Sequence, residues 1–356
     1  MDTKIIQISQ DFTRFTPRDE EGLREAGAIL QKGGLVAFPT ETVYGLGGDA
    51  LNPESSRKIY AAKGRPSDNP LIIHISRFED IQKIVKELPE AAVRAADAFW
   101  PGPLTMILPK AESVPLETTG GLDTVAVRFP SHPVAKKLIA YSGGYIAAPS
   151  ANLSGKPSPT SAEYVREDMD GRIEMIVDGG DVGIGLESTI LDLTERMPRI
   201  LRPGYITREM LQSVLGDVAV DVGFIEPDSG QTPKAPGMKY RHYAPDGRLV
   251  IVEGKMQSVV AYINACVERD QRSGEKTGVI GTSEVLDQYR ADVVKCIGSR
   301  KDEEEIARNL FSVLREFDDE KVTSIYSESF PVRGLGQAIM NRLLKAAGHR
   351  VVRLAE

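Results

Sequence analysis

The sequence has very little cysteine and no long apolar run. Cys266 and Cys296 are its only cysteines, they lie far apart, and neither belongs to a Cys-x-x-Cys pair. We therefore expect neither a disulfide framework nor a thiolate zinc site, which fits a reducing compartment. No run approaches membrane-spanning length, and the amino terminus leads into no long apolar stretch with a small-residue cleavage site. These absences predict a cytoplasmic protein without membrane contact.

Familiar catalytic and nucleotide-binding patterns are also missing. The four histidines, His74, His132, His242 and His349, are scattered, so no zinc site is predicted. No Gly-x-x-x-x-Gly-Lys-Ser/Thr occurs, and Gly334-Leu335-Gly336 lacks the third glycine of a dinucleotide-binding loop. No Ser-His-Asp or Cys-His nucleophile pattern is found. If the protein is an enzyme, these absences favour catalysis by positioning of the reactants over nucleophilic attack by a side chain.

The composition is that of an acidic globular protein. The 44 Lys and Arg residues against 51 Asp and Glu give a formal net charge of -7, which argues against broad, sequence-blind coating of nucleic acid. Hydrophobic residues make up 41% and charged residues 27% of the chain, so material for cores is ample. A length of 356 residues exceeds one average domain and favours two.

Helical and strand patterns alternate along the first 220 residues, which predicts a mixed α/β domain with a many-stranded sheet. The expected helices cover residues 23–30, 54–62, 134–140 and 208–215. Two further helices are expected, one ending near Trp100 and one beginning at residue 162. The expected strands cover 35–38, 71–75, 104–108, 124–129, 145–148, 175–177, 189–191 and 200–201.

Periodicity disappears between residues 221 and 247, where glycine and proline recur. The segment is longer than most loops within compact domains, and its half around Lys239–Tyr243 is aromatic and basic. We interpret it as a linker with a function. Beyond it, residues 248–356 alternate strands and helices, which predicts a smaller, mostly parallel, Rossmann-like α/β domain. Its expected strands are 249–252, 277–280 and 324–326, and its expected helices are 259–267, 306–317 and 338–347.

Two triplets stand where a short element ends and a loop begins. Lys63-Gly64-Arg65 ends a predicted helix, and Ser150-Ala151-Asn152 follows a predicted strand. Two fixed cations with two small hydrogen-bonding side chains could form a binding site for a nucleoside triphosphate. The two triplets therefore predict ATP binding without a P-loop. In isolation, Lys63 and Arg65 are better interpreted as solvated cations that complement a helix dipole.

Other candidates have a structural interpretation beside the functional one. Thr40 could simply cap a strand end, and His74 lies in an apolar strand where a buried core histidine is the ordinary outcome. Arg128 lies within Val125–Phe129, and a guanidinium on a half-buried strand requires an anion, either a ligand or a structural ion-pair partner. Ser188 and Arg202 carry little weight alone.

Several of these residues fall in motifs that together resemble the YrdC-like domain of L-threonylcarbamoyladenylate synthases. The match extends to about residue 216, and the segment Ala235–Pro245 is similar to the linker of the two-domain members of that family. The motifs that carry the resemblance are Pro39–Gly47, Lys63–Pro66, Trp100–Thr105, Thr124–Arg128, Ala148–Asn152, Glu187–Ile190 and Arg202–Gly204.

The resemblance implies a fold, a domain arrangement and a reaction. The fold is a YrdC-like twisted mixed sheet with helices, as a catalytic domain over 1–220, then a linker and active-site lid over 221–247 and a Rossmann-like domain over 248–356. The reaction is that of a nucleotidyltransferase, which converts ATP, L-threonine and bicarbonate or CO2 into L-threonylcarbamoyl-AMP and pyrophosphate. A downstream transferase then uses the product to form N6-threonylcarbamoyladenosine in tRNA.

Site residues are implied by the same resemblance. Lys63 and Arg65 would hold phosphates, with Mg2+ accompanying ATP and no metal held by the protein alone. The ATP-binding residues would be Lys63, Arg65, Thr119, Ser150, Asn152, Ser158, Arg202 and Tyr240. The L-threonine-binding residues would be Thr40, His74, Arg128 and Ser188.

Within the linker, Tyr240 and His242 would close over the site as a lid. Two alternatives remain open. One is a module that binds structured RNA. If the chain is an enzyme instead, weak contact with RNA is still possible. The other is carbamoyl transfer from carbamoyl phosphate, although relatives of that kind carry zinc-binding cysteines that this chain lacks.

Overall fold

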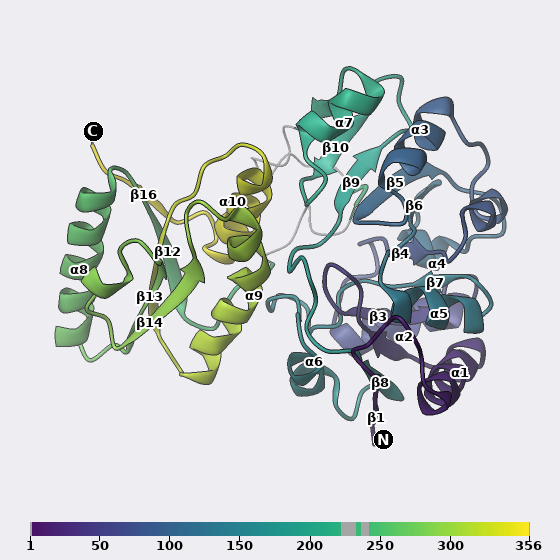
Figure 1. The fold of residues 1–356 in the computed structure, drawn as a ribbon, viewed down its shortest axis with the longest axis horizontal. Coiled ribbons are helices and arrows are strands. Elements are labelled where there is room, and N and C mark those ends of the chain that lie inside the picture. The colour runs from purple at the N-terminus through teal and green to yellow at the C-terminus, as the bar shows by residue number, and fades with distance from the viewer. Residues whose placement is uncertain (1, 222–232, 236–241, 356) are drawn as a thin grey trace. The chain divides into compact units, whose positions relative to one another are not determined.

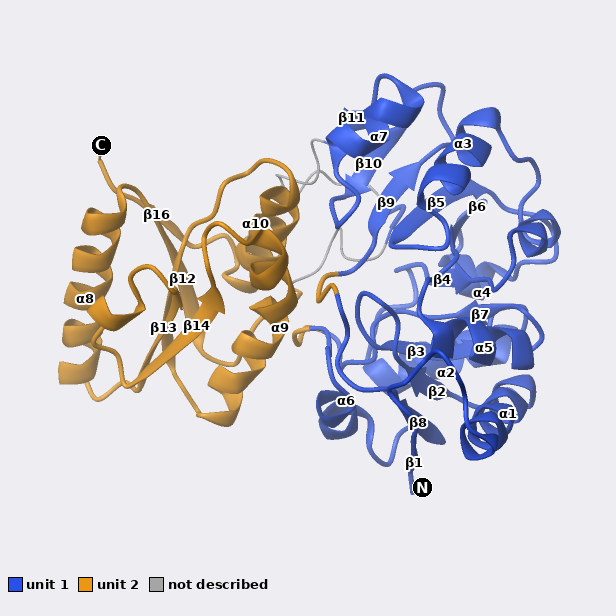
Figure 2. Cartoon of the chain, viewed as in Figure 1, with its two compact units in different colours: residues 1–154, 158–183, 187–240 blue, residues 155–157, 184–186, 241–356 orange. Residues whose placement is uncertain are grey.

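A computed structural model describes residues 2–221, 233–235 and 242–355. The chain forms two compact units, shown in different colours in Figure 2. Unit 1 comprises residues 1–154, 158–183 and 187–240, and unit 2 comprises residues 155–157, 184–186 and 241–356. Two short stretches that are early in the sequence therefore belong to the second unit.

Unit 1 is built on an eleven-stranded mixed sheet with the order β1-β8-β2-β3-β7-β4-β6-β5-β9-β10-β11. The sheet contains both parallel pairs, such as β4 with β6, and antiparallel pairs, such as β5 with β6. The strands are β1 Lys4–Gln7, β2 Val36–Phe38, β3 Gly45–Asp49, β4 Ile72–His74, β5 Leu104–Pro109, β6 Thr124–Arg128, β7 Ile146–Ala147, β8 Met175–Asp178, β9 Thr189–Asp192, β10 Arg199–Arg202 and β11 Ala219–Val220.

Helices of unit 1 begin and end at residues suited to those positions. Thr16 and Asp19 form a capping box at the start of α1, and Gly64, at φ 62°, ends α2 in the left-handed conformation that glycine adopts without strain. The helices are α1 Pro17–Gln31, α2 Pro53–Lys63, α3 Glu90–Phe99, α4 Leu116–Thr119, α5 Pro133–Tyr141, α6 Ala162–Met169 and α7 Arg208–Leu215, with the 3-10 helix η1 at Phe78–Lys83.

The two faces of the central strands differ in what covers them. Ile73, Val127 and Met106 point into the large core, whereas their neighbours along the same strands form a separate small apolar cluster on the other face. That small cluster consists of Ile72, Ile107, Ala126, Ile190, Leu201 and Ala235. Because Ala235 is fully buried in it, the described part of the predicted linker packs on this face of the sheet.

Unit 2 is a five-stranded, wholly parallel sheet with the order β14-β13-β15-β12-β16. Helix α8 lies on one face, and α9 and α10 lie on the other (Figure 1). The elements are β12 Arg248–Glu253, α8 Met256–Arg272, β13 Thr277–Thr282, the 3-10 helix η3 Leu286–Gln288, β14 Val293–Gly298, α9 Glu303–Asp319, β15 Ser324–Glu328, α10 Leu335–Ala346 and β16 Val351–Arg353.

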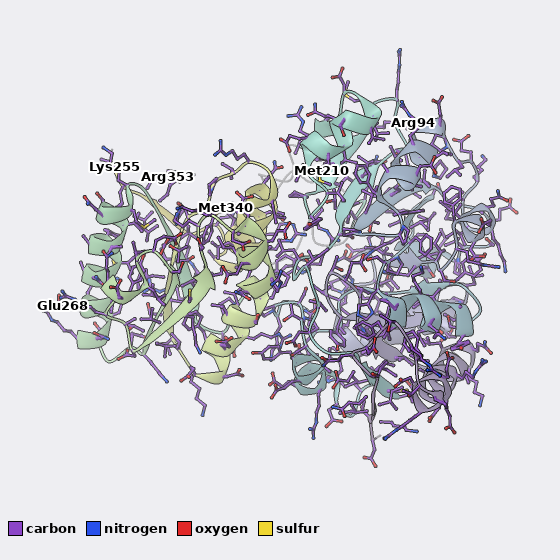
Figure 3. The ribbon with its side chains drawn as sticks, viewed as in Figure 1. Arg94, Met210, Lys255, Glu268, Met340 and Arg353 are labelled. Carbon is purple, nitrogen blue, oxygen red and sulfur yellow. The ribbon has the colours of Figure 1, made fainter. Side chains whose placement is uncertain are left out.

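Side chains on α8 follow the expected amphipathic pattern. Val259, Ile263 and Val267 are buried against the sheet, whereas Glu268 projects away from it with 65% of its side chain exposed (Figure 3). The residues 155–157 are tied into this unit, since Arg315 donates to the carbonyl oxygen of Pro157 at 2.7 Å and Gly155 accepts from the Ala244 amide at 2.9 Å.

The predicted fold class, a twisted mixed sheet followed by a smaller Rossmann-like domain, is confirmed. The sequence patterns missed several strands: β1, β3, β11, β14 and β16. None of the described helices combines the length and the apolar character that a bilayer crossing requires.

Candidate active site

Lys63 and the Ser150–Asn152 triplet, 87 residues apart in sequence, lie together. Lys63, at the last turn of α2, is only 3% exposed, and its Nζ donates to the carbonyl oxygens of Ser150 and Asn152 at 2.5 Å each. Ser150 Oγ in turn donates to Asn152 Oδ1 at 2.5 Å. The two triplets thus lie together, with the Lys63 ammonium group bonded to backbone carbonyl oxygens where the strand β7 ends.

Arg65 is placed by the loop that follows α2. Its Nε donates to the carbonyl oxygen of Asn69 at 3.3 Å and its Nη2 to that of Pro70 at 3.2 Å. The same loop packs against α4, because the Leu71 amide donates to the Thr118 carbonyl oxygen at 3.0 Å. Thr119 is 1% exposed, and its hydroxyl is engaged by the carbonyl oxygen of Leu122 at 2.7 Å.

The turn between β2 and β3 connects this group to a second one. Thr40 Oγ1 lies 2.9 Å from Thr42 Oγ1 and donates to the Val43 carbonyl oxygen at 2.6 Å, so the turn is internally bonded. Immediately after it, Gly45 pairs with Ser150 in an isolated antiparallel bridge. Thr40 is therefore five residues before Gly45, the residue that pairs with Ser150 of the Lys63 group.

The second group gathers around Arg128 at the end of β6. In the sheet, Arg128 is aligned with His74 on β4 and with Thr105 on β5. Its side chain is 5% exposed, and Nη2 lies 2.7 Å from Glu41 Oε1 and 3.5 Å from Thr40 Oγ1. The guanidinium is thus buried beside a carboxylate, while its Nε has no hydrogen-bond partner among the described residues.

His74 is neutral in this environment. Burial, and secondly the charge of Arg128, lower the pKa of its imidazole to about 3, although hydrogen bonding to the backbone at Ile72 and Ile146 opposes the change. Its ring also contacts the ring of Phe38 edge to face, with 6.3 Å between centroids. With its pKa lowered in this way, His74 is expected to be uncharged near neutral pH and to pack or make hydrogen bonds.

Ser188 extends the second group toward Arg202. Its hydroxyl lies 2.7 Å from that of Thr105, and the guanidinium of Arg202 donates to its carbonyl oxygen through Nε at 3.1 Å and Nη2 at 3.0 Å. One residue earlier, Glu187 accepts a hydrogen bond from Ser158 Oγ at 2.6 Å. Both serines and Arg202 are 4% exposed or less.

The predicted residues thus form two groups joined by the turn after β2. The first contains Lys63, Ser150 and Asn152, with Arg65 on the adjoining loop, and the second contains Thr40, Arg128, Ser188 and Arg202, with His74 on the neighbouring strand. Tyr240 lies outside the described residues. His242 belongs to unit 2, where its ring lies 5.6 Å from that of Tyr243. The roles of all these residues stay predictions.

Sequence reasoning missed three buried polar residues at these positions. Glu41 pairs with Arg128, Thr105 bonds Ser188, and Asn69, 2% exposed, has an Oδ1 atom without a hydrogen-bond partner among the described residues. Glu41 lies between two threonines of the motif Pro39–Gly47, but nothing in that pattern pairs it with Arg128. Thr105 and Asn69 carried no signal that periodicity could supply.

Comparison with known protein families gives two adjacent matches. A family described as telomere recombination, the Sua5, YciO and YrdC group, matches residues 28–204. A second family, the C-terminal domain of threonylcarbamoyl-AMP synthase, matches residues 206–348. Together they cover most of the chain.

Individual relatives match along nearly their whole length. The threonylcarbamoyl-AMP synthase of Pyrococcus abyssi is 51% identical over 94% of this chain and 97% of its own, and that of Bacillus subtilis is 49% identical over 96% and 98%. Among solved structures, P. abyssi Sua5 complexed with L-threonine is 49% identical, covers 99% of this chain and 100% of its own, and superimposes with a TM-score of 0.93.

Proposed function

This chain belongs to the threonylcarbamoyl-AMP synthase family, and we propose that it joins ATP, L-threonine and bicarbonate into L-threonylcarbamoyl-AMP and pyrophosphate. The observation that supports our placement of ATP is the convergence of Lys63 on Ser150 and Asn152 at a strand exit. The product would pass to a downstream transferase that modifies tRNA. The cytoplasm is its expected location.

The reaction consists of two bond-forming steps. The amine nitrogen of threonine attacks the carbon of CO2, released from bicarbonate, and loses a proton to give a carbamate. A carbamate oxygen then attacks the α-phosphorus of ATP, and the bond to pyrophosphate breaks. Both steps bring anions together, so fixed positive charge and juxtaposition would supply most of the acceleration.

We assign the phosphates and the nucleotide to the first group of residues. Lys63 and Arg65 would exchange their bonds to backbone carbonyl oxygens for bonds to the triphosphate, which offers stronger, charge-assisted acceptors. Ser150 and Asn152 would contact the nucleotide. Thr119, Ser158, Arg202 and Tyr240 are secondary candidates for ATP.

The members of the second group other than Arg202 would bind threonine. A buried guanidinium with an unbonded Nε–H suits the substrate's carboxylate, so Arg128 is the expected carboxylate partner. Thr40 and Ser188 would supply hydroxyl groups. His74, held neutral by burial, would contribute hydrogen bonding or packing without exchanging protons.

Mg2+ would accompany ATP and neutralise charge on its phosphates. Such an ion keeps several waters and needs few protein ligands. Within the described ranges no three His, Cys, Asp or Glu side chains are grouped to hold a metal ion.

The linker would act as a lid. Its described residues Pro233–Ala235 support this proposal, because Ala235 is buried on the sheet face that also carries Arg128 and Thr105, and Lys234 Nζ lies 3.1 Å from Asp192 Oδ2 on β9. A covered site would protect the mixed anhydride of the product from water.

The decisive experiment measures pyrophosphate release from ATP with each co-substrate omitted in turn. We expect release to require both threonine and bicarbonate and to yield threonylcarbamoyl-AMP, identified by mass. Release that continues without threonine would contradict the proposed reaction. Activity with carbamoyl phosphate in place of bicarbonate would indicate carbamoyl transfer instead.

A further inference from the structure

Glu41 and Arg128 form a largely buried ion pair, and no role has yet been assigned to Glu41. Glu41 Oε1 lies 2.7 Å from Arg128 Nη2, and the two side chains are 13% and 5% exposed. Burying two charges is costly unless their geometry is fixed by further bonds. The surroundings of both groups therefore decide what the pair does.

The carboxylate is fixed from two directions. Glu41 lies between Thr40 and Thr42, whose bonded hydroxyls tighten the turn, and its Oε2 accepts a hydrogen bond from the Ser131 amide at 3.3 Å. Ser131 follows β6, the strand that carries Arg128, so the carboxylate bridges the turn after β2 and the loop after β6.

One nitrogen of the Arg128 guanidinium contacts the carboxylate of Glu41, and another has no hydrogen-bond partner among the described residues. Nη2 contacts Glu41 and, at 3.5 Å, Thr40 Oγ1, whereas the buried Nε has no hydrogen-bond partner in the part of the chain that the structure describes. A buried N–H without an acceptor is unfavourable, and its retention indicates that a ligand supplies the acceptor. A carboxylate oxygen is the strongest such acceptor.

We propose that Glu41 is a positioning residue, which holds the Arg128 guanidinium so that its Nε–H is presented to the carboxylate of threonine. The inference rests on the threonine assignment for Arg128 made above. Glu41 would not touch the reacting atoms. Its removal would leave the charge of Arg128 in place but release its orientation.

The test compares steady-state constants of the full chain with Glu41→Ala and Glu41→Gln. We expect Glu41→Ala to raise KM for threonine by roughly tenfold or more, with KM for ATP unchanged. Glu41→Gln keeps the length of the side chain and an oxygen for the Ser131 amide, so it should restore KM to within about threefold of the parent value. Glu20→Ala, which removes a carboxylate paired with Lys137 on a different helix, is the control and should change neither constant.

Two further arms separate the possible failures. If Arg128→Ala raises KM for threonine but Glu41→Ala does not, the positioning role is wrong while the threonine assignment holds. If Arg128→Ala leaves KM for threonine unchanged, both are wrong. If Glu41→Ala raises the KM values for ATP and threonine equally and lowers the melting temperature, Glu41 is merely structural and the inference is overturned.

Discussion

At the residue scale, Lys63 offers the most direct test of the ATP assignment. Lys63→Met keeps the apolar stem of the side chain but removes its charge, so phosphate stabilisation should be lost and kcat/KM for ATP should fall on the order of 100-fold or more. Lys63→Arg should retain part of the activity, because it keeps a cation at the end of α2. Pyrophosphate release measured over a range of ATP concentrations checks both expectations.

A matched control for that prediction lies on the same helix. Lys58 Nζ also donates to a backbone carbonyl oxygen, that of Gly33, so Lys58→Met removes a comparable bond elsewhere in unit 1. It should leave kcat/KM within about twofold of the parent enzyme. Equal losses in the Lys58 and Lys63 variants would indicate that Lys63 only stabilises the fold.

Single residues differ in how far the sequence could predict them. Lys63 and Ser150 could each be placed, because a helix pattern ended at Gly64 and a strand pattern ended before Ser150, but it was the family resemblance that paired them. Glu41 could not be paired with Arg128 in this way, because that contact depends on the strand order, which brings residues 87 apart together. Local patterns contain no information about such neighbours.

At the element scale, the described part of the linker provides a second prediction. Ala235 is fully buried in the apolar cluster on the face formed by β4, β5, β6, β9 and β10, so Ala235→Gln would force a larger, polar side chain into a space that cannot satisfy it. The segment should be released from the sheet. Trypsin should then cleave after Lys234 about tenfold faster, as followed by intact mass.

The neighbouring ion pair should matter less than this apolar contact. The Lys234 side chain is 41% exposed, although that of Asp192 is 2% exposed, so water screens the pair at its cationic end and reduces its contribution. Asp192→Asn should therefore change the cleavage rate little, and Ala111→Gln, a change at a partly buried alanine in the same unit, should not change it at all. Unaltered cleavage in Ala235→Gln would contradict the packing of the linker on the sheet.

Elements missed by the sequence patterns share a physical cause. β3 consists largely of glycine, because a Cβ at Gly47 would lie 2.8 Å from Ile146 Cγ2 and 2.9 Å from the Phe38 ring. Close packing between strands therefore removes the apolar alternation by which a strand is recognised. β14 and β16 are edge strands with mixed exposure, so they also lack a clear alternating pattern.

At the scale of the whole molecule, the division into units was only partly predictable. Composition and the loss of periodicity near residue 221 indicate two α/β regions, and the structure has a mixed sheet followed by a parallel one. Nothing local indicates that residues 155–157 and 184–186 belong with unit 2. That membership depends on long-range contacts such as the one between Arg315 and Pro157.

The pH dependence of unit 2 can be tested through Asp318 at the end of α9. Burial raises the pKa of its carboxyl to about 6, against the hydrogen bond from the Asp246 amide; the Asp246 charge also raises it, and Lys156 and Arg315 lower it. A folded-state pKa above the unfolded value of 3.8 means that the native state binds more protons between about pH 4 and pH 6. The contribution of Asp318 to the free energy of unfolding therefore falls as the pH rises through that window.

Asp318→Asn keeps an acceptor for the Asp246 amide but cannot carry the charge. It should stabilise the protein by about 1 kcal/mol or more at pH 7.5 and make little difference at pH 4, because one pKa unit corresponds to about 1.4 kcal/mol. Calorimetric melting of the parent and variant at both pH values measures the difference, in which other titrating groups cancel. If the variant is less stable than the parent at pH 7.5, then Lys156 and Arg315 stabilise the charged carboxylate more than burial opposes it.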